Sequence, residues 1–384
     1  MYPLSTQHLI EWPEDGRTHT AQWRSESGAP PPRRVVVADD RMTADAAYRL
    51  VCEGTALLWR GDYQGARQLL AALARRVDRG PRRPRGRRGP AESTAEAFHR
   101  HRQEQGRRAR LLGMLLVPLD AGLAVPLRRA PDVREACARV YGAAQGPSVI
   151  SLRELLGLIG AHEWRVKGVE IAALGGDRVH PYYGVFSPVR GEYVDLVAEA
   201  PLPASPTAAF DIGTGTGVLA AVLARRGVER VVATDQDERA LACARENVER
   251  LGVADRVEVV CADLFPPGRA PLIVCNPPWV PARPSSPVEY AVYDPGSRML
   301  HGFLNGLADA LTPGGEGWLI LSDLAEHLGL RTREELLDAF EAAGLRVVDR
   351  LDTRPVHPRA TDSADPLHRA RAAEVTSLWR LAAG

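Results

Sequence analysis

The chain has 384 residues, of which 45% are hydrophobic and 25% charged, and its formal net charge is +1 at pH 7. This composition is typical of a globular protein, and the length favours two domains. No apolar run approaches the roughly 18 residues that a membrane helix requires, and Met1 to Gly28 lacks the apolar core of a secretory signal. We therefore expect a cytoplasmic protein without a membrane span, whose net charge alone selects no particular partner.

The cysteines argue against both a disulfide framework and a zinc site, because they are scattered, odd in number and never spaced as Cys-x-x-Cys. They are Cys52, Cys137, Cys243, Cys261 and Cys275. We expect reduced thiols in the core and no bound metal.

The first part of the chain, residues 1–178, has mainly helical patterns. Apolar residues recur at helical spacing from Thr43 to Asp78 and are interrupted at Gly61-Asp62, which predicts a helical hairpin. Further helices are predicted over Ser93–Leu119, Asp132–Tyr141 and Ser151–Ile159. This part contains no repeat and no catalytic constellation that we can identify. We expect a mainly α-helical N-terminal domain that serves recognition or packing.

An Arg/Pro/Gly-rich loop, residues 79–90, interrupts the helical part. Its composition is that of a mobile linker, because it has too few apolar residues to bury a core. Its arginines could contact nucleic-acid phosphates. Against that interpretation, Lys167 is the only lysine in the chain, which indicates that coding bias supplies arginine wherever a basic residue is needed.

Residues 179–200 are predicted to form an extended connector, which begins with an aromatic-rich segment, Val179 to Phe186, typical of a hairpin. From residue 201 to residue 384 strand and helix patterns alternate, which predicts a mostly parallel sheet with helices on both faces. The expected strands are 208–212, 230–234, 257–261, 272–275, 317–321, 345–351 and 375–381. The expected helices are 217–226, 238–251, 299–311 and 332–343. No helix separates the last two strands, so the final strand is expected to run antiparallel.

A glycine-rich turn follows the first strand of this sheet, in the segment Phe210-Asp211-Ile212-Gly213-Thr214-Gly215-Thr216-Gly217. Its glycines let ligand atoms approach the backbone, and a helix begins just beyond it. A dinucleotide-binding Gly-x-Gly-x-x-Gly turn would need glycine at position 218, where this chain has Val218. The turn therefore favours a nucleoside without a pyrophosphate group, the alternative being a structural turn without a ligand.

Acidic residues follow the next two strands. Asp235, with Gln236 beside it, ends the second strand and is expected to accept hydrogen bonds from ribose hydroxyls. Its neighbour Asp237 better fits a helix cap. Asp263 follows the third strand and could accept from an adenine amino group, with Leu264 covering the ring. Because three successive strands of one sheet end in an acidic residue, we expect a nucleoside site at their carboxyl ends.

The fourth strand ends in Asn276-Pro277-Pro278-Trp279. An amide or base amino nitrogen is a poor nucleophile, and the Asn276 side-chain oxygen and the Pro277 carbonyl could each accept one of its N–H groups. The prolines stiffen the turn, and Trp279 can stack on a planar group. The alternative is a rigid loop with a packing tryptophan. The proline-rich segment from Val280 to Arg298 is expected to face the substrate, and we assign no role to its Asp294 or to Arg298.

With these motifs the chain resembles class I S-adenosylmethionine-dependent methyltransferases that carry an Asn-Pro-Pro-aromatic motif. They include release-factor glutamine methyltransferases and related small-domain RNA and DNA N-methyltransferases. The resemblance implies a Rossmann-like seven-stranded α/β domain that binds S-adenosyl-L-methionine. It assigns cofactor binding to Phe210, Asp211, Gly213, Thr214, Gly215, Gly217, Asp235, Gln236, Asp263, Leu264 and Asn276, and catalysis to Asn276, Pro277, Pro278 and Trp279.

Several features bear on the substrate. Val185-Phe186-Ser187-Pro188 looks like the segment that precedes the catalytic domain of the glutamine methyltransferases, but their Pro-Arg-Pro-x-Thr-Glu run is replaced by residues 188–192. Their Gly-Gly-x-Asp-Gly stretch is missing around His301-Gly302. The leading hypothesis is methylation of a protein glutamine in a release-factor-like or other loop. The alternatives are an exocyclic amino group in RNA or DNA, a small molecule, and a scaffold that binds the cofactor without transfer.

Overall fold

The computed structural model describes residues 8–79, 93–143, 146–189, 191–203, 207–284, 287–355 and 365–384. The described chain divides into two compact units, one within Met1–Ala91 and His99–Glu163 and one within Glu92–Phe98 and Trp164–Gly384. Most of the predicted arginine-rich loop, including Arg82, Arg83, Arg87 and Arg88, lies outside the described residues. No helix in the described ranges is long and apolar enough to cross a membrane.

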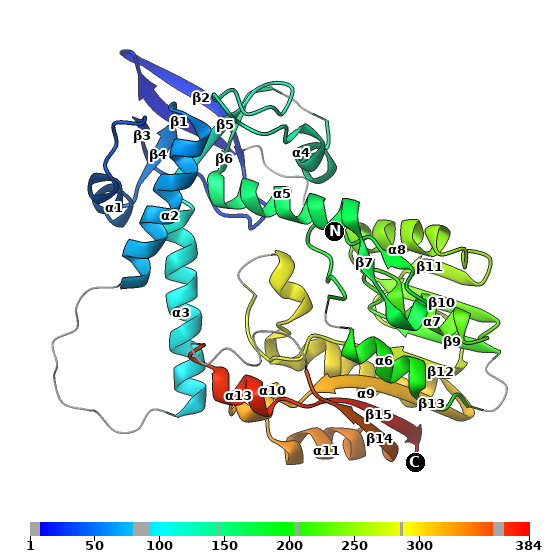
Figure 1. Ribbon diagram of the computed structural model, residues 1–384. Coiled ribbons are helices and arrows are strands. Elements are labelled where there is room, and N and C mark those ends of the chain that lie inside the picture. Colours follow the sequence, from blue (N-terminus) through cyan, green and yellow to red (C-terminus); the bar gives the residue numbers. More distant parts are fainter. Residues whose placement is uncertain are drawn as a thin grey trace. The chain divides into compact units, whose positions relative to one another are not determined.

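The first unit is built on a six-stranded sheet with the order β1-β2-β6-β5-β4-β3 (Figure 1). Strands β3, β4 and β5 are mutually parallel, and β6 runs antiparallel to β5. The strands are β1 (Leu9–Glu14), β2 (Arg17–Arg24), β3 (Arg34–Ala38), β4 (Thr55–Trp59), β5 (Leu115–Leu119) and β6 (Ser148–Ser151). The helices that accompany them are α1 (Ala44–Cys52), α2 (Tyr63–Arg79), α3 (Thr94–Leu112), α4 (Arg134–Tyr141) and α5 (Leu152–Lys167), of which α3 and α5 also contribute residues to the second unit.

The prediction of a mainly α-helical N-terminal domain was wrong, because it missed this sheet. Leu57 and Leu58 lie in β4 rather than in a helical hairpin, and Leu115 and Leu116 lie in β5. All five residues of each of these strands are buried. A short apolar run of this kind fits a buried strand and a helix equally well when periodicity is the only guide. The long helical patterns on either side led to the helical assignment.

The second unit contains a seven-stranded sheet with the order β11-β10-β9-β12-β13-β15-β14 (Figure 1). Its strands are β9 (Ala208–Ile212), β10 (Arg230–Asp235), β11 (Val257–Cys261), β12 (Ala270–Cys275), β13 (Leu311–Ser322), β14 (Leu345–Thr353) and β15 (Thr376–Ala383). Strand β15 pairs antiparallel with both β13 and β14, which confirms the expected reversal of the last strand. The predicted α/β fold with a seven-stranded sheet is confirmed for this unit.

Two helical layers cover this sheet. The main helices are α6 (Glu192–Glu199), α7 (Val218–Arg225), α8 (Glu238–Arg250), α9 (Arg298–Ala310), α10 (Leu324–His327), α11 (Arg333–Ala342) and α13 (His368–Ala373). Successive strand residues alternate between two apolar cores, so that Leu272 and Val274 join one core while Ile273 and Cys275 join the other. The first core includes α6, α7 and α8, and the second includes α9 and α11.

The second unit begins earlier than the predicted boundary at residue 179. The expected hairpin over Val179 to Phe186 does not form, and a two-stranded sheet of β7 (Val169–Glu170) and β8 (Arg178–Val179) ends at its first residue. The short 3-10 helix η1 (Ala172–Leu174) lies between these strands. Ile171 and Leu174 belong to the core shared with α7. Their burial attaches residues 164–178 to the second unit.

Three of the five cysteines, Cys137, Cys243 and Cys275, are buried free thiols, whereas Cys52 and Cys261 are exposed. The expectation of core thiols is therefore correct for three of them. Cys261 is exposed because it ends β11, at the edge of the sheet. In the described part of the chain, no group of three His, Cys, Asp or Glu side chains is arranged to hold a metal ion.

Candidate functional site

The glycine-rich turn joins the end of β9 to the start of α7. Gly213, Gly215 and Gly217 have φ angles of +72°, +56° and +80°, a region that residues with a Cβ rarely adopt. At Gly217 a Cβ would lie 3.3 Å from the Cα of Ala244, so α8 packs directly on the turn. At Gly215 an added Cβ would meet, among the described residues, only Val185 Cγ1, at 3.9 Å. The turn thus keeps its backbone accessible at Gly215, as a ligand-binding turn requires.

Asp211 supports this turn from within. Its side chain is buried, and Oδ2 accepts hydrogen bonds from the Thr214 hydroxyl at 2.6 Å and from the Ala220 N–H at 3.1 Å. Burial raises the pKa of the Asp211 carboxyl to about 6, although both hydrogen bonds act in the opposite direction. The Asp211 carboxylate thus stabilises the turn from its buried side, and its predicted role in cofactor binding stays a prediction.

The end of β10 contacts the same turn. Asp235 Oδ2 accepts from the Gly215 N–H at 3.1 Å, and Oδ1 accepts from the Asp237 N–H at 3.0 Å. Burial raises the pKa of the Asp235 carboxyl. Asp237 caps α8 by accepting from the Arg239 N–H at 2.7 Å, as the sequence predicts. The half-buried Asp235 carboxylate is thereby held beside the glycine turn.

The residues expected to surround an adenine ring follow β11. Gln236 Nε2 donates to Asp263 Oδ1, which joins the ends of β10 and β11. Leu264 has a φ of +68°, and its carbonyl accepts from the Thr234 hydroxyl at 2.6 Å. A Cβ on Gly302 would lie 2.7 Å from Leu264 Cδ1, so this glycine lets Leu264 pack on α9. Strained backbone of this kind is often found at ligand-binding positions.

The Asn-Pro-Pro-Trp motif follows directly from β12. The indole N–H of Trp279 donates to Asn276 Oδ1 at 2.9 Å. Pro277 is buried, whereas Asn276, Pro278 and Trp279 are half-buried. Trp279 packs against three apolar clusters, one of which contains Val280 and Leu324. The indole therefore orients the carboxamide, a contact that the sequence analysis missed, and stacking of Trp279 on a substrate stays a prediction.

Asp294 has a role that the sequence analysis did not assign. It is buried and accepts from the backbone N–H groups of Arg298, Met299 and Leu300, at 2.9, 2.8 and 3.3 Å. It therefore caps α9, where the residue before the helix, Ser297, makes no capping bond. The end of the Met299 side chain lies beside Gly213, since an added Cβ there would be 2.5 Å from Met299 Cε. Asp294 thus fixes the helix that supports the glycine turn.

The two ends of the segment that follows the Asn-Pro-Pro-Trp motif are bonded to each other. Val280 bridges to Tyr293, and the Asp294 N–H donates to the Val280 carbonyl at 2.9 Å. Tyr290 is 60% exposed and lies between these anchored ends. The position of this segment directly after Trp279 suits the predicted substrate-facing role, which stays a prediction.

Residues 179–344 match the family model described as "Methyltransferase small domain". The chain is 40% identical to the ribosomal protein L11 methyltransferase of Pelotomaculum thermopropionicum over 144 residues, which are 37% of this chain and 39% of that relative. It is 40% identical to the release factor glutamine methyltransferase of Cereibacter sphaeroides over 122 residues, 31% of this chain and 40% of the relative. It is 35% identical to the tRNA1(Val) (adenine(37)-N6)-methyltransferase of Bacteroides thetaiotaomicron over 127 residues, 31% of this chain and 54% of the relative.

The chain thus spans between about two fifths and about half of the length of these relatives. The matched segment contains the glycine turn, the acidic strand ends and the Asn-Pro-Pro-Trp motif. The seven strands of the second unit and its antiparallel last strand, which lies beyond the matched segment, agree with the outline predicted from the sequence. Residues 179–344 therefore match the methyltransferase small domain family, within a unit whose seven-stranded sheet agrees with the predicted Rossmann-like α/β fold.

Proposed function

We propose that the protein is an S-adenosyl-L-methionine-dependent N-methyltransferase that acts on a planar amide or amino nitrogen, with a protein glutamine side chain as the leading substrate. The observation that carries this proposal is the half-buried Asn276 carboxamide at the carboxyl end of β12, in the same sheet edge as the glycine turn. Strands β9 and β12 are adjacent and parallel, so their carboxyl ends lie side by side. The family match to residues 179–344 supports the proposal.

The residues at the turn fit this cofactor. Space remains beside Gly215, and Asp235 presents a half-buried carboxylate to the same region. Asp263 would accept a hydrogen bond from the adenine amino group, and Leu264 would cover the ring. When bound, the cofactor supplies an electrophilic methyl group on sulfur.

Asn276 and Pro277 would act on the acceptor nitrogen. Asn276 Oδ1 already accepts from the Trp279 indole and keeps a second lone pair that can accept an N–H from the substrate. The Pro277 carbonyl would accept the other N–H. These bonds draw an amide or base amino nitrogen toward tetrahedral geometry. The acceptor nitrogen, held by Asn276 and Pro277, would release a proton to water as it gains the methyl group, so no strong base is required.

Replacing Asn276 with alanine tests this mechanism. We expect turnover to fall by about a hundredfold or more, with nearly unchanged affinity for S-adenosylhomocysteine in calorimetry, because the carboxamide acts on the acceptor rather than on the turn. The control is Asn305→Ala on α9, a residue that the proposed mechanism does not use. Unchanged turnover in Asn276→Ala would contradict the mechanism.

Labelled cofactor identifies the acceptor. A cell lysate treated with the enzyme and methyl-labelled cofactor should incorporate label into protein, and peptide mass spectrometry should place it on a glutamine. The 40% identity to a release factor glutamine methyltransferase supports this expectation. Label on lysine would contradict the glutamine assignment. A protein that binds the cofactor and transfers nothing to protein, nucleic acid or small molecules would be a scaffold.

The second candidate is N-methylation of an exocyclic amino group in RNA or DNA. Its support is the 35% identity to a tRNA adenine N6-methyltransferase. A filter-binding series in increasing salt tests it, because contacts with phosphates give a steep salt dependence. If RNA or DNA is the substrate, binding should weaken steeply with salt, and replacing Arg82, Arg83, Arg87 and Arg88 with alanine should reduce it. Weak, salt-insensitive binding would contradict this candidate.

A further inference from the structure

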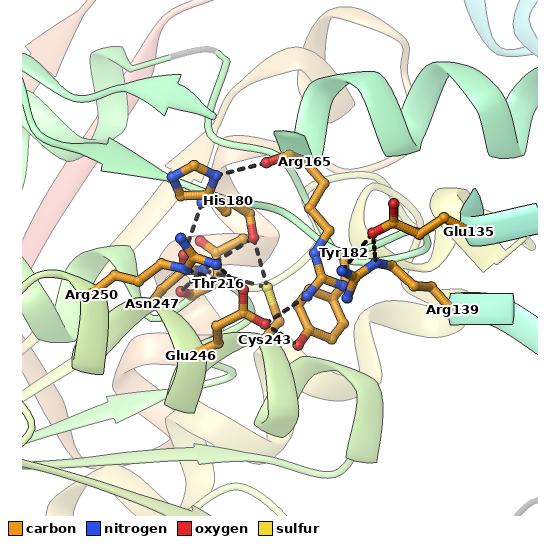
Figure 2. Close-up of polar contacts among 10 residues, drawn as sticks. All are labelled: Glu135, Arg139, Arg165, His180, Tyr182, Thr216, Cys243, Glu246, Asn247 and Arg250. Atoms are coloured by element: carbon orange, nitrogen blue, oxygen red, sulfur yellow. Dashed lines mark hydrogen bonds and ion pairs between the residues drawn. The ribbon is translucent and has the colours of Figure 1, made fainter. Parts of the chain in front are cut away.

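Asn247, on α8, connects two segments that lie far apart in the sequence. Its side chain is completely buried. Oδ1 accepts from the His180 N–H at 2.8 Å, and Nδ2 donates to the Thr216 carbonyl at 3.0 Å (Figure 2). Thr216 belongs to the glycine turn. His180 begins residues 180–186, the first part of the predicted 179–200 connector, and in this subsection 'connector' means these seven residues. One buried carboxamide therefore joins the connector to the turn.

The chemistry of this position requires a carboxamide. A buried polar side chain must satisfy its hydrogen-bonding groups, and Asn247 meets a donor on one side and a carbonyl on the other. A carboxylate could accept from His180 but could not donate to Thr216. One helical turn earlier, the Cys243 thiol donates to the His180 carbonyl at 3.5 Å. Burial raises the pKa of this thiol to about 12, so it remains a donor at neutral pH.

The connector is also fixed to the end of α5. His180 Nδ1 and the Arg165 carbonyl are 2.6 Å apart, and the Arg165 guanidinium lies 3.7 Å from the centre of the Tyr182 ring. The Tyr182 hydroxyl and Arg165 both bind Glu246 on α8 (Figure 2). The connector is thus bonded to Asn247, Arg165 and Glu246, and of these Asn247 also bonds the glycine turn.

The connector passes close to the accessible glycine of the turn. Within the part of the chain that the structure describes, Val185 of the connector has the only atom that an added Cβ on Gly215 would meet within 4 Å. Val185 packs with Ala240 and Cys243 of α8, and Tyr182 packs against the same cluster. A shift of the connector would therefore change the wall beside Gly215, where the cofactor is expected to bind.

We propose that Asn247 is a positioning residue for the cofactor. By bonding both the Thr216 carbonyl and the His180 main chain, Asn247 fixes the connector relative to the glycine turn, so that the connector forms a wall of the cofactor site. This inference rests on the proposed function. Asn247 acts through the turn and does not touch the reacting atoms. Its loss should therefore lower the affinity for the cofactor and leave turnover at saturating cofactor nearly unchanged.

The variant Asn247→Asp tests the proposal, because it keeps the shape of the side chain and the acceptor for His180 but removes the donor to Thr216. We expect the Kd for S-adenosylhomocysteine, measured by calorimetry, and the KM for the cofactor to rise about tenfold or more. The value of kcat at saturating cofactor should stay within about threefold of the wild type. An unchanged Kd would overturn the proposal.

Two controls separate positioning from a general loss of stability. Glu249→Gln changes an exposed side chain on the same helix that takes no part in holding the connector, and should leave Kd unchanged. Phe340→Leu loosens the apolar core on the opposite face of the sheet and should lower the Tm with little change in Kd. If Phe340→Leu raised Kd as much as Asn247→Asp at an equal loss of Tm, the effect would be one of stability and the proposal would fail.

Hydrogen–deuterium exchange of the wild-type protein gives a second test that does not depend on whether the variant folds. S-adenosylhomocysteine should slow exchange in peptides covering residues 180–186 and 213–218 together. Protection of the turn alone would overturn the proposal while leaving the proposed function intact. A wild-type protein that does not bind this ligand would instead overturn the proposed function and the positioning role with it.

Discussion

The two units each present the carboxyl ends of adjacent parallel strands, but they use these ends differently. In the first unit the ends of β3 and β4 contact each other through side chains. A Cβ on Gly65 would lie 2.3 Å from Asp40 Oδ1, and the Asp62 N–H donates to Asp40 Oδ2 at 3.0 Å. The carboxylate of Asp40 thus fills the space beside Gly65 and Asp62, at the start of α2. In the second unit the Asp235 carboxylate accepts from the Gly215 N–H, but an added Cβ on Gly215 would meet, among the described residues, only Val185 Cγ1 at 3.9 Å.

The buried carboxylates at the two sheet edges, Asp62 and Asp211, differ in their hydrogen-bond partners and in the direction of their pKa shifts. Asp62 is 4% exposed, and its Oδ2 accepts from Arg129 at 2.8 Å and from Arg128 at 2.9 Å. The Arg129 guanidinium holds the pKa of Asp62 well below its ordinary value, with Arg128 and the Gln64 N–H acting in the same direction. Asp211 instead pairs with a hydroxyl and a backbone N–H, and its pKa is raised. Both units therefore have a sheet edge formed by the carboxyl ends of parallel strands. The side chains that follow these strands determine whether the space at that edge is filled (a closed edge) or accessible to a ligand (an open edge).

The largest effect that would sharpen this comparison is the pH dependence contributed by Asp211. Its folded pKa, about 6, lies above the ordinary value of 3.8, so in this interval the native state binds a proton that the unfolded chain has lost. The free energy of unfolding should therefore fall as pH rises through this window, by about 3 kcal/mol in total. Asp211→Asn should lack this dependence. Urea unfolding followed by hydrogen exchange in β9 peptides measures the difference, and parallel curves for the two proteins would contradict the prediction.

A side chain placed beside the glycine turn should strongly weaken cofactor binding at the sheet edge of the second unit. Gly215→Val places a β-branched side chain at a φ of +56° and into the free space beside the turn. We expect the Kd for S-adenosylhomocysteine to rise about a hundredfold, equivalent to about 2.7 kcal/mol. Calorimetry measures the affinity, and circular dichroism checks that the fold is kept. A Kd within about threefold of the wild type would show that the ligand does not approach this glycine.

The matched change in the first unit should alter stability and leave binding unchanged. Gly65→Ala would bring a Cβ to 2.3 Å from Asp40 Oδ1 and 3.2 Å from Trp59 Cζ2. We expect this overpacking to destabilise the first unit by about 2 kcal/mol, measured by hydrogen exchange in β4 peptides. Calorimetry with S-adenosylhomocysteine should give an unchanged Kd. A tenfold weaker affinity would mean that the closed edge also contributes to ligand binding, and the contrast between the edges would be wrong.

The smallest effect concerns Trp279 at the acceptor side of the open edge. Trp279→Phe keeps an apolar ring but removes the N–H that donates to Asn276 Oδ1. We expect kcat to fall about fivefold to tenfold, the value of one hydrogen bond, with an unchanged Kd for S-adenosylhomocysteine. Trp12→Phe in the first unit is the control, since it removes a similar indole bond, to Glu14, at 2.8 Å. Steady-state kinetics with an identified substrate would contradict the prediction if both variants kept full kcat.

Features of the second unit that depend on neighbouring residues in the chain were predictable from the sequence. The bounds of β9 and β11 agree with the predicted strands, because each is a short apolar run bounded by turn-forming residues. The cap at Asp237 follows from the same local pattern. The glycine turn and the Asn-Pro-Pro-Trp motif are contiguous segments, so their residue types alone indicate a ligand site.

The sheet of the first unit and the contacts within the site depended on tertiary structure. Strands β4 and β5 pair across a long stretch of chain, and periodicity cannot distinguish such buried strands from helix. The bond between Asn247 and His180 spans 67 positions, and Asp294 caps α9 from outside the usual position directly before the helix, which is occupied by Ser297. The residue types along the chain thus specify which chemical groups are available at the carboxyl edge of the second unit. Long-range packing determines which of these groups meet, and it could not be predicted because it leaves no periodic signal in the chain.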